Sequence, residues 1–127
     1  MKNLFDIRDR VVVITGGTGI LGHAISKYLA QQGAKIALLD RREEEGQERV
    51  KEIEDEGGDA MFLITDVLNK ATLEKNLEDI LARYGRIDVL LNAAGGNMPG
   101  ATIAPDATFF DLSPEAFEKV LNLNLVG

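Results

Sequence analysis

The sequence predicts an α/β fold built on a doubly wound parallel sheet. Four short apolar runs, each with the length of a strand, alternate with segments of helical periodicity. Three of the runs are continuously apolar, which is typical of strands buried on both faces. Alternation of strands and helices implies parallel strands joined by right-handed crossovers. The runs are VVVIT (11–15), IALLD (36–40), MFLIT (61–65) and IDVLL (87–91).

Four helices are expected between and after these strands. The first has one apolar face that begins at Leu21 and stops at Gly33. The second, over residues 42–58, is mostly charged and is expected to be exposed. The third ends at Gly85, a typical C-terminal cap, and the fourth begins at Ser113, a typical N-cap that precedes a proline.

Length, composition and charge are those of one globular domain over residues 1–127, with 45% hydrophobic and 28% charged residues. The formal net charge of −7 argues against a nucleic-acid partner, because no basic patch offsets the acidic residues. The absence of cysteine excludes disulfides and thiolate metal sites. The start of the chain is too charged for a signal peptide, and no apolar run is long enough to cross a membrane. We therefore expect a cytoplasmic protein without a membrane partner.

The stretch TGGTGILG, residues 15–22, lies between the first strand and the first helix. Its glycines fit G-x-G-x-x-G from Gly17 and also T-G-x-x-G-x-x-G from Thr15. Without Cβ atoms, Gly17 and Gly19 would let a diphosphate approach the main chain, and Gly22 would let the helix pack against the strand. Free N–H groups at the helix N-terminus add partial positive charge. This context favours a nucleotide-binding turn, and a tight turn without a ligand is the alternative.

An acidic residue, Asp40, ends the second strand at about the spacing of 20 residues expected for the carboxylate that binds an adenosine ribose. That carboxylate would accept from both ribose hydroxyls and repel a 2′-phosphate, which favours NAD over NADP. Arg41 and Arg42 follow directly, and a guanidinium there could accommodate the phosphate, so NADP stays open. The alternative for Asp40 is a carboxylate that caps the next helix.

Crossover handedness predicts the strand order 3-2-1-4, with the first two helices on one face and the third and fourth on the other. This is a Rossmann-like sheet that is truncated after its fourth strand. Strand four, over residues 87–91, would be an exposed apolar edge, and the fourth helix would carry apolar residues in need of partners. We therefore expect a homo-oligomer that self-associates through strand four and helix four.

Several motifs together resemble the N-terminal half of the short-chain dehydrogenase/reductase family, over essentially the whole chain. They are TGGTGILG, LLDR, ITDV (64–67), LLNAAGG (90–96) and the ending VLNLNLVG. The resemblance implies a nicotinamide dinucleotide as the cofactor and a small polar molecule as the substrate of a complete enzyme.

The resemblance also assigns roles to individual residues. Asp66 and Val67 would border the adenine ring, and residues 92–95 would run past the adenosine ribose toward the nicotinamide. Asn124 would hold a water molecule in the family's proton relay. Read singly, Asp66 could be an N-cap, Asn92 a turn former and Asn124 a polar residue on an apolar helix. The expected cofactor-binding residues are Gly16, Gly17, Thr18, Gly19, Ile20, Leu21, Gly22, Asp40, Arg41, Asp66, Val67, Asn92, Ala93, Ala94 and Gly95.

Two features bear on the subgroup within that family. The compact branch usually has glycine where this chain has Ile20, and the spacing found here is commoner in the extended branch, which acts on nucleotide sugars. In contrast, AAGGNMPGAT, at the start of the long irregular stretch 95–113, resembles the fructuronate/mannonate-type sugar-acid reductases of the compact branch. A sugar acid or a similar polyol is thus the leading expectation for the substrate.

The family's acid–base pair, a Tyr and a Lys four residues apart, is missing from this chain. Four residues after Tyr28 comes Gln32, and four after Tyr84 comes Asp88. The sole histidine, His23, is expected to be an exposed helix residue near the phosphates rather than a catalytic one. No cluster has metal-ligand spacing. We expect weak NAD binding, largely mimicked by ADP-ribose, and no turnover, and a non-catalytic binding module or gene fragment stays the alternative.

Overall fold

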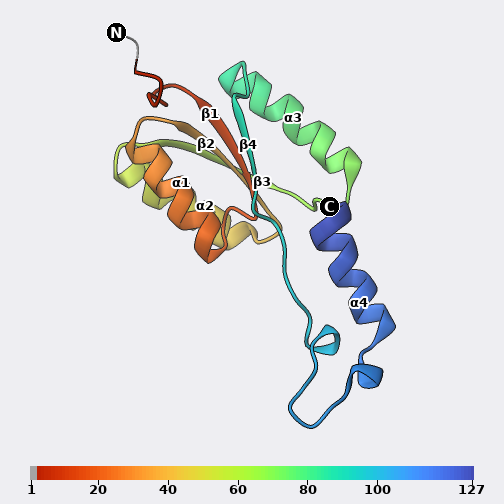
Figure 1. Cartoon of the computed structure of the whole chain (residues 1–127). Coiled ribbons are helices and arrows are strands. Elements are labelled where there is room, and N and C mark those ends of the chain that lie inside the picture. Colours follow the sequence, from red (N-terminus) through yellow and green to blue (C-terminus); the bar gives the residue numbers. More distant parts are fainter. Residues whose placement is uncertain (1–2) are drawn as a thin grey trace. The chain divides into compact units, whose positions relative to one another are not determined.

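Four parallel strands form one sheet in the order β3-β2-β1-β4, as predicted (Figure 1). The computed structural model describes residues 3–127, which divide between two compact units, Met1–Ala93 and Ala94–Gly127. The sheet and three helices belong to the first unit. That both units make one domain stays a prediction. The elements of the first unit are β1 (Val11–Thr15), α1 (Ile20–Gln31), β2 (Lys35–Asp40), α2 (Glu43–Asp55), β3 (Asp59–Ile64), α3 (Lys70–Tyr84) and β4 (Val89–Asn92).

The strands alternate their side chains between two apolar clusters, one on each face of the sheet. Val12 and Ile14 of β1 pack in a cluster with Ile53 of α2, on the face that α1 and α2 cover. Val11 and Val13 face the other side, where Ile80 of α3 closes a second cluster. Burial on both faces explains why the strand sequences are continuously apolar. The predicted sides of the first three helices are confirmed.

The fourth strand begins later than the sequence predicts, at residue 89 instead of 87. The reason is Asp88, which exchanges hydrogen bonds with Val11 before the strand starts. The amide of Asp88 donates to Val11 O, and the Val11 amide donates to Asp88 Oδ2, both at 2.9 Å. Val89 and Leu90 are 46% and 58% exposed, so the predicted exposed apolar edge is confirmed.

The caps of the helices follow the sequence with one addition. Gly85 ends α3 with φ at +74°, as predicted. Ser113 begins α4 (Pro114–Leu121), and its side chain accepts from the Ala116 amide at 3.2 Å. The start of α3 depends on Asn69, whose side chain accepts from the Thr72 amide, and this cap was not predicted.

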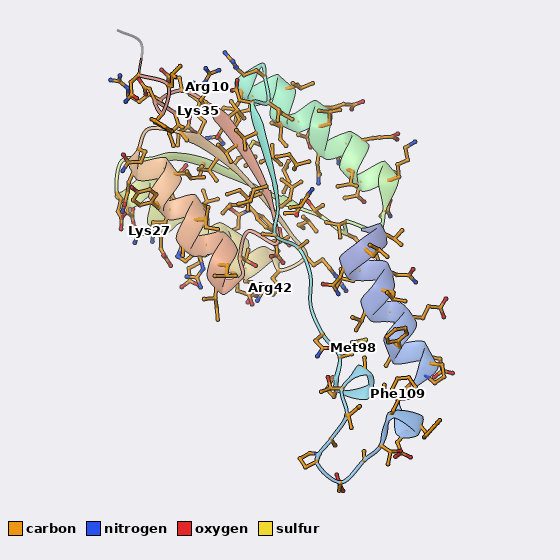
Figure 2. The ribbon with its side chains drawn as sticks, in the orientation of Figure 1. Arg10, Lys27, Lys35, Arg42, Met98 and Phe109 are labelled. Carbon is orange, nitrogen blue, oxygen red and sulfur yellow. The ribbon has the colours of Figure 1, made fainter. Side chains whose placement is uncertain are left out.

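The second unit combines α4 with the irregular stretch that precedes it. Two short 3₁₀ turns, Pro99–Ala101 and Phe109–Asp111, interrupt that stretch, and a π-helical turn, Asn122–Val126, follows α4. The Ser113 amide donates to Gly100 O at 3.0 Å, which closes the loop onto the start of α4. Exposed apolar side chains such as Phe109 mark this unit (Figure 2). The expected side of the fourth helix on the sheet stays a prediction, because α4 belongs to this unit.

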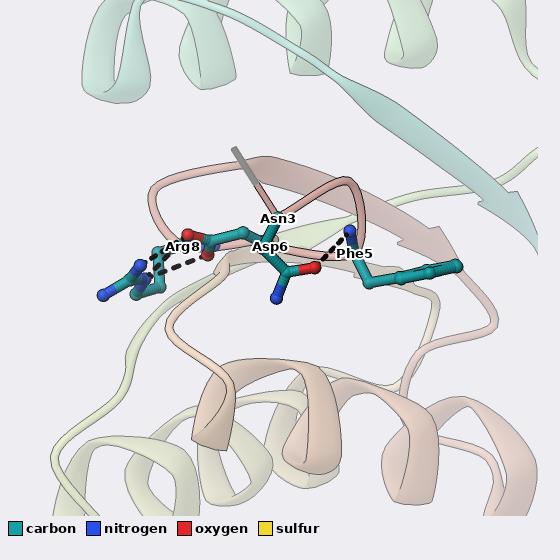
Figure 3. A network of polar contacts seen from close by, with 4 residues as sticks. All are labelled: Asn3, Phe5, Asp6 and Arg8. Carbon is teal, nitrogen blue, oxygen red and sulfur yellow. Dashed lines mark hydrogen bonds and ion pairs between the residues drawn. The ribbon is translucent and has the colours of Figure 1, made fainter. Parts of the chain in front are cut away.

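The chain enters the sheet through a short turn that is held by polar contacts (Figure 3). The Phe5 amide donates to Asn3 Oδ1 at 3.0 Å, and Arg8 forms an ion pair with Asp6. The side chain of Phe5 is 89% exposed, whereas Ile7 packs against the apolar cluster of α1 and α2. Ile7 therefore anchors this turn to the sheet.

Candidate functional site

The turn between β1 and α1 has the main-chain geometry of a compact loop that opens a helix. Gly16 has φ at +65°, a conformation that L side chains rarely adopt. The Gly19 amide donates to Gly16 O at 3.1 Å and the Gly17 amide donates to Leu39 O at 3.3 Å. Gly19 is the N-cap of α1, and no side chain caps the start of this helix. The turn therefore presents main chain to its surroundings.

Two of the glycines are required by close packing. A Cβ atom at Gly22 would lie 2.4 Å from Gly16 O, so this glycine lets α1 approach the main chain of the turn, and its packing against the strand stays a prediction. A Cβ atom at Gly17 would lie 2.8 Å from Leu38 Cδ2. Gly17 thus packs on β2, a role that the sequence did not indicate. At Gly19 the nearest atom would be Gly16 O at 3.3 Å, which leaves this glycine in the least crowded surroundings of the three.

The first turn of α1 offers main-chain N–H groups without helical partners. The first helical hydrogen bond runs from the His23 amide to Gly19 O at 2.8 Å, so the amides of residues 20–22 precede the hydrogen-bonded part of the helix. Thr18 is 4% exposed, and its Oγ1 is buried without a partner in the described part of the chain. Unpaired donors beside the positive end of a helix fit an anionic group.

Asp40 lies directly beside this turn. Its Oδ2 accepts from the Thr18 amide at 3.2 Å, and its Oδ1 accepts from the Arg41 amide at 2.8 Å and the Arg42 amide at 3.3 Å. The carboxylate therefore joins the end of β2 to the glycine turn. It also accepts from the amides just before α2, but Arg42 is the N-cap of that helix and no side chain caps it, so the helix-capping alternative for Asp40 is wrong.

Hydrogen bonds and an ion pair stabilise the negative charge of Asp40. Burial alone would raise the pKa of this carboxyl, but hydrogen bonds from the Thr18 and Arg42 amides and from the Arg42 guanidinium outweigh burial, and the pKa is lowered from its ordinary value. The guanidinium of Arg42 (Figure 2) forms an ion pair with Asp40, with Nε 3.4 Å from Oδ1. If Gly19 carried a Cβ atom, that atom would lie 4.0 Å from Nη2 of Arg42. A cation and an anion thus stand together at the turn.

The end of β3 reaches the same region. The Thr65 amide donates to Asp40 O at 2.8 Å, which places the segment that carries Asp66 and Val67 next to the end of β2. Asp66 is exposed, and its Oδ1 accepts from the Leu68 amide at 3.0 Å. The N-cap alternative for Asp66 is wrong, because Asn69 caps α3.

The end of β4 lies against the end of β1. Asn92 is in register with Thr15, and the Ala93 amide donates to Thr15 Oγ1 at 3.2 Å. Asn92 and Ala93 therefore stand beside the residue that starts the glycine turn. The carboxyl ends of all four strands carry the predicted residues, as expected for ligand sites in open parallel sheets.

In the second unit, Asn124 holds the main chain of the residues that follow β4. Its Nδ2 donates to Gly96 O at 2.7 Å and to Val120 O at 2.8 Å, and its Oδ1 accepts from the Gly96 amide at 3.1 Å. A Cβ at Gly95 would lie 2.6 Å from Asn124 Oδ1. Asn124 thus fixes the main chain at Gly95 and Gly96. The sequence analysis did not predict this contact, although the two adjacent glycines were a signal for a close approach. The role of Asn124 toward a water molecule stays a prediction.

Neither tyrosine has the surroundings of an acid–base catalyst. The Tyr84 hydroxyl donates to Asp59 Oδ1 at 3.0 Å. Burial, followed by that hydrogen bond, raises the pKa of Tyr84, which opposes formation of a phenolate. Tyr28 is 62% exposed.

His23 is less exposed than the sequence predicts. Its side chain is 19% exposed, and Nε2 lies 2.9 Å from Glu52 Oε2 on α2. The polar face of α2 packs near the start of α1, so this histidine lies between two helices instead of facing solvent.

Membrane-spanning helices and metal-binding clusters of side chains are absent from the described residues, 3–127. No helix among them is long and apolar enough to cross a membrane. They contain no group of three or more His, Cys, Asp or Glu side chains placed to hold a metal ion.

A glycine turn after β1, a carboxylate at the end of β2 and the strand order β3-β2-β1-β4 define a Rossmann-like α/β protein. The family model for short chain dehydrogenases matches residues 10–127, and the chain belongs to that family.

Relatives and solved structures agree with this assignment. The uncharacterized oxidoreductase UxuB of Bacillus subtilis is 39% identical over 96% of this chain and 47% of its own length. The structure of a protein proposed to be a D-mannonate oxidoreductase from Haemophilus influenzae, with bound NAD, has a TM-score of 0.88 at 34% identity and covers 95% of this chain and 47% of its own. Actinorhodin polyketide ketoreductase with NADPH has a TM-score of 0.81 at 28% identity, with 92% and 42% covered. The chain spans about half the length of the curated relatives that it matches.

Proposed function

We propose that this chain is the dinucleotide-binding portion of a short-chain oxidoreductase. The observation that carries the proposal is the glycine turn, where unpaired amides of residues 20–22 and the orphaned hydroxyl of Thr18 lie beside the Asp40 carboxylate. These groups fit a diphosphate and the ribose attached to it. When bound, the nicotinamide of such a cofactor would accept or donate a hydride.

The remaining predicted residues extend the site along the carboxyl ends of the strands. Asp66 and Val67 would border the adenine, since Thr65 is bonded to Asp40. Asn92 and Ala93 would follow the adenosine ribose, since they lie beside the end of β1. The roles of Ala94 and Gly95 toward the nicotinamide, and of Asn124 in holding a water molecule of the proton relay, rest on the family resemblance.

NAD is the cofactor that Asp40 favours. An ionised carboxylate accepts from ribose hydroxyls and repels a 2′-phosphate, and the lowered pKa keeps Asp40 ionised at neutral pH. Arg42 opposes this preference, because its guanidinium stands beside the same carboxylate. One similar structure holds NAD and another NADPH, so the preference for NAD rests on Asp40 itself.

A sugar acid or polyol is the substrate class that we propose for a complete enzyme. The support is the similarity to a protein proposed to be a D-mannonate oxidoreductase and the AAGGNMPGAT stretch. This chain alone is not expected to turn over, because it lacks the family's Ser and its Tyr and Lys four residues apart. That observation also favours the second candidate, a binding module without catalysis. An enzyme acting on nucleotide sugars is supported only by Ile20 in the glycine turn.

Titration calorimetry with NAD, NADP and ADP-ribose tests the proposal. We expect weak binding of NAD, similar binding of ADP-ribose and weaker binding of NADP. Gly19→Val should abolish binding of all three, because the side chain would fill the space over the turn. Ala71→Val, an exposed position in the first turn of α3, is the matched control and should bind as the unmodified chain does. Tighter binding of NADP than of NAD would refute the preference, and no binding of any ligand would refute the function.

A further inference from the structure

A buried pair of polar side chains joins α3 to the residue that follows β3. Asn76 of α3 is 4% exposed and Thr65 is 2% exposed. Asn76 Nδ2 donates to Thr65 Oγ1 at 2.6 Å, and the same hydroxyl donates to Leu63 O at 2.9 Å. Asn76 lies one turn before Ile80, which packs in the apolar cluster on this face of the sheet (Figure 1). Core packing alone does not require such a pair, since two apolar side chains of the same shape can be equally stable.

Thr65 is also held from a second side. Its amide donates to Asp40 O at 2.8 Å, and the carboxylate of Asp40 accepts from the Thr18 amide in the glycine turn. The main-chain contact is open to any residue at position 65, but the contact with α3 requires a hydroxyl there and a donor at Asn76. The side chain of Asn76 therefore helps to fix the chain where it leaves β3.

A compact turn, residues 66–69, follows directly. Asp66 Oδ1 accepts from the Leu68 amide at 3.0 Å, the Asn69 amide donates to Asp66 O at 2.9 Å, and Asn69 caps α3. The turn thus begins beside Thr65 and ends on the helix that carries Asn76. Asp66 is exposed, and its Oδ2 makes no hydrogen bond within the described part of the chain, so this oxygen is available to a ligand.

We propose that Asn76 is a positioning residue that sets the base preference of the dinucleotide site, because it holds Thr65 and so aims the Asp66 carboxylate at the exocyclic amino group of adenine. The inference rests on the proposed function, in which Asp66 borders the adenine. An ionised carboxylate only accepts hydrogen bonds. Adenine donates from its amino group, whereas hypoxanthine has a carbonyl oxygen at that position. A fixed Asp66 therefore favours adenine, and a loosened turn discriminates less.

The test compares NAD with nicotinamide hypoxanthine dinucleotide, which differs from NAD in that one group. NMR titration measures weak binding, and the amides of residues 20–22 report both ligands, since both carry the same diphosphate. The unmodified chain should bind NAD about tenfold more tightly, the effect expected for a hydrogen bond to a charged group.

Asn76→Ala removes the donor and leaves the hydrogen bond from Thr65 to Leu63 O in place. It should lower the preference for NAD about threefold or more, as expected for residues of one hydrogen-bond network. Thr65→Val and the double variant should reach the same lowered preference, because each breaks the same contact. Thr65→Ser keeps the hydroxyl and should keep the preference.

Asp59→Ala is the matched control, because it loosens α3 at the opposite end of β3. Tyr84 Oη and Arg83 Nη2 both contact Asp59 Oδ1 there, at 3.0 and 2.8 Å. This variant should unfold at a lower temperature and discriminate between the two dinucleotides as the unmodified chain does.

Three results would overturn one of the two claims. If Asn76→Ala weakens both dinucleotides equally, the pair is merely structural and the inference is refuted, while the proposed function stands. Equal binding of both dinucleotides by the unmodified chain also refutes the inference. If the unmodified chain binds neither, the proposed function itself fails. Thermal unfolding checks each variant, and the comparison of Thr65→Val with Thr65→Ser decides the matter if Asn76→Ala does not fold.

Discussion

At the scale of single residues, Asp40 serves both the protein and the proposed ligand. Its two oxygens already accept from the amides of Thr18, Arg41 and Arg42. A carboxylate has about four lone-pair directions. One on Oδ2 therefore remains for a ribose hydroxyl, because the Thr18 amide is the one partner of that oxygen among the described residues.

Asp40→Ala should change the preference between the two cofactors. Loss of a charged acceptor is worth about 1.5–3 kcal/mol, so we expect about a tenfold or greater loss of NAD affinity. NADP should bind more tightly than before, because the repulsion is removed and Arg42 is released from its ion pair. Calorimetry with both dinucleotides measures the change.

The double variant Asp40→Ala with Arg42→Ala separates these two effects. It should lose the gain for NADP and keep the loss for NAD. If NADP binds equally well with and without Arg42, that guanidinium has no part in selecting the cofactor.

At the scale of elements, Asp88 connects the starts of β1 and β4. Its main chain and side chain both bond to Val11, and Arg10 Nη1 lies 3.0 Å from Asp88 Oδ1. The hydrogen bond from the Val11 amide, followed by one from Arg86, lowers the pKa of Asp88 to about 2.

This lowered pKa predicts how stability depends on pH. A carboxyl with a depressed folded pKa contributes stability above its unfolded value, here 3.8, and loses it as the pH falls toward about 2. Asp88→Asn should therefore be less stable than the unmodified chain at pH 5, and the difference should shrink between pH 4 and pH 2. Urea unfolding at a series of pH values measures it. A constant difference over this range would contradict the assigned pKa.

Elements were predicted well where the signal is local, and less well where it depends on packing. Continuous apolar runs such as residues 11–15 identified the buried strands, and Gly85 and Ser113 marked helix ends through their own conformations or side chains. The start of β4 was missed because Asp88 bonds to Val11, 77 positions away in sequence.

The residues of the candidate site also divide into those that local sequence predicts and those whose contacts depend on packing. The spacing of the glycines and of Asp40 is visible in the sequence, because the proposed role of each residue depends on its own position next to a strand end. The packing of Gly17 on Leu38 and the contact between His23 and Glu52 required knowledge of which helix and strand lie adjacent. Both corrections concern contacts between elements.

At the scale of the whole molecule, the exposed edge of β4 predicts association. Val89 and Leu90 lie on a strand that pairs only with β1 among the described strands, and unpaired apolar edges favour pairing with another chain. We propose that the chain self-associates through β4, with α4 as a second contact. Light scattering should show a mass that rises with concentration, and Leu90→Lys should shift it toward the monomer. A stable monomer at all concentrations would contradict the proposal.

The central claim is that the main chain of residues 16–22 receives a diphosphate while Asp40 binds the adjoining ribose. Amide chemical shifts, followed by NMR during titration with ADP-ribose, test this most directly. The account predicts the largest changes at Thr18, at the amides of residues 20–22 and at Arg41, which bonds to Asp40. Saturating changes confined to other parts of the chain, with these amides unmoved, would contradict it.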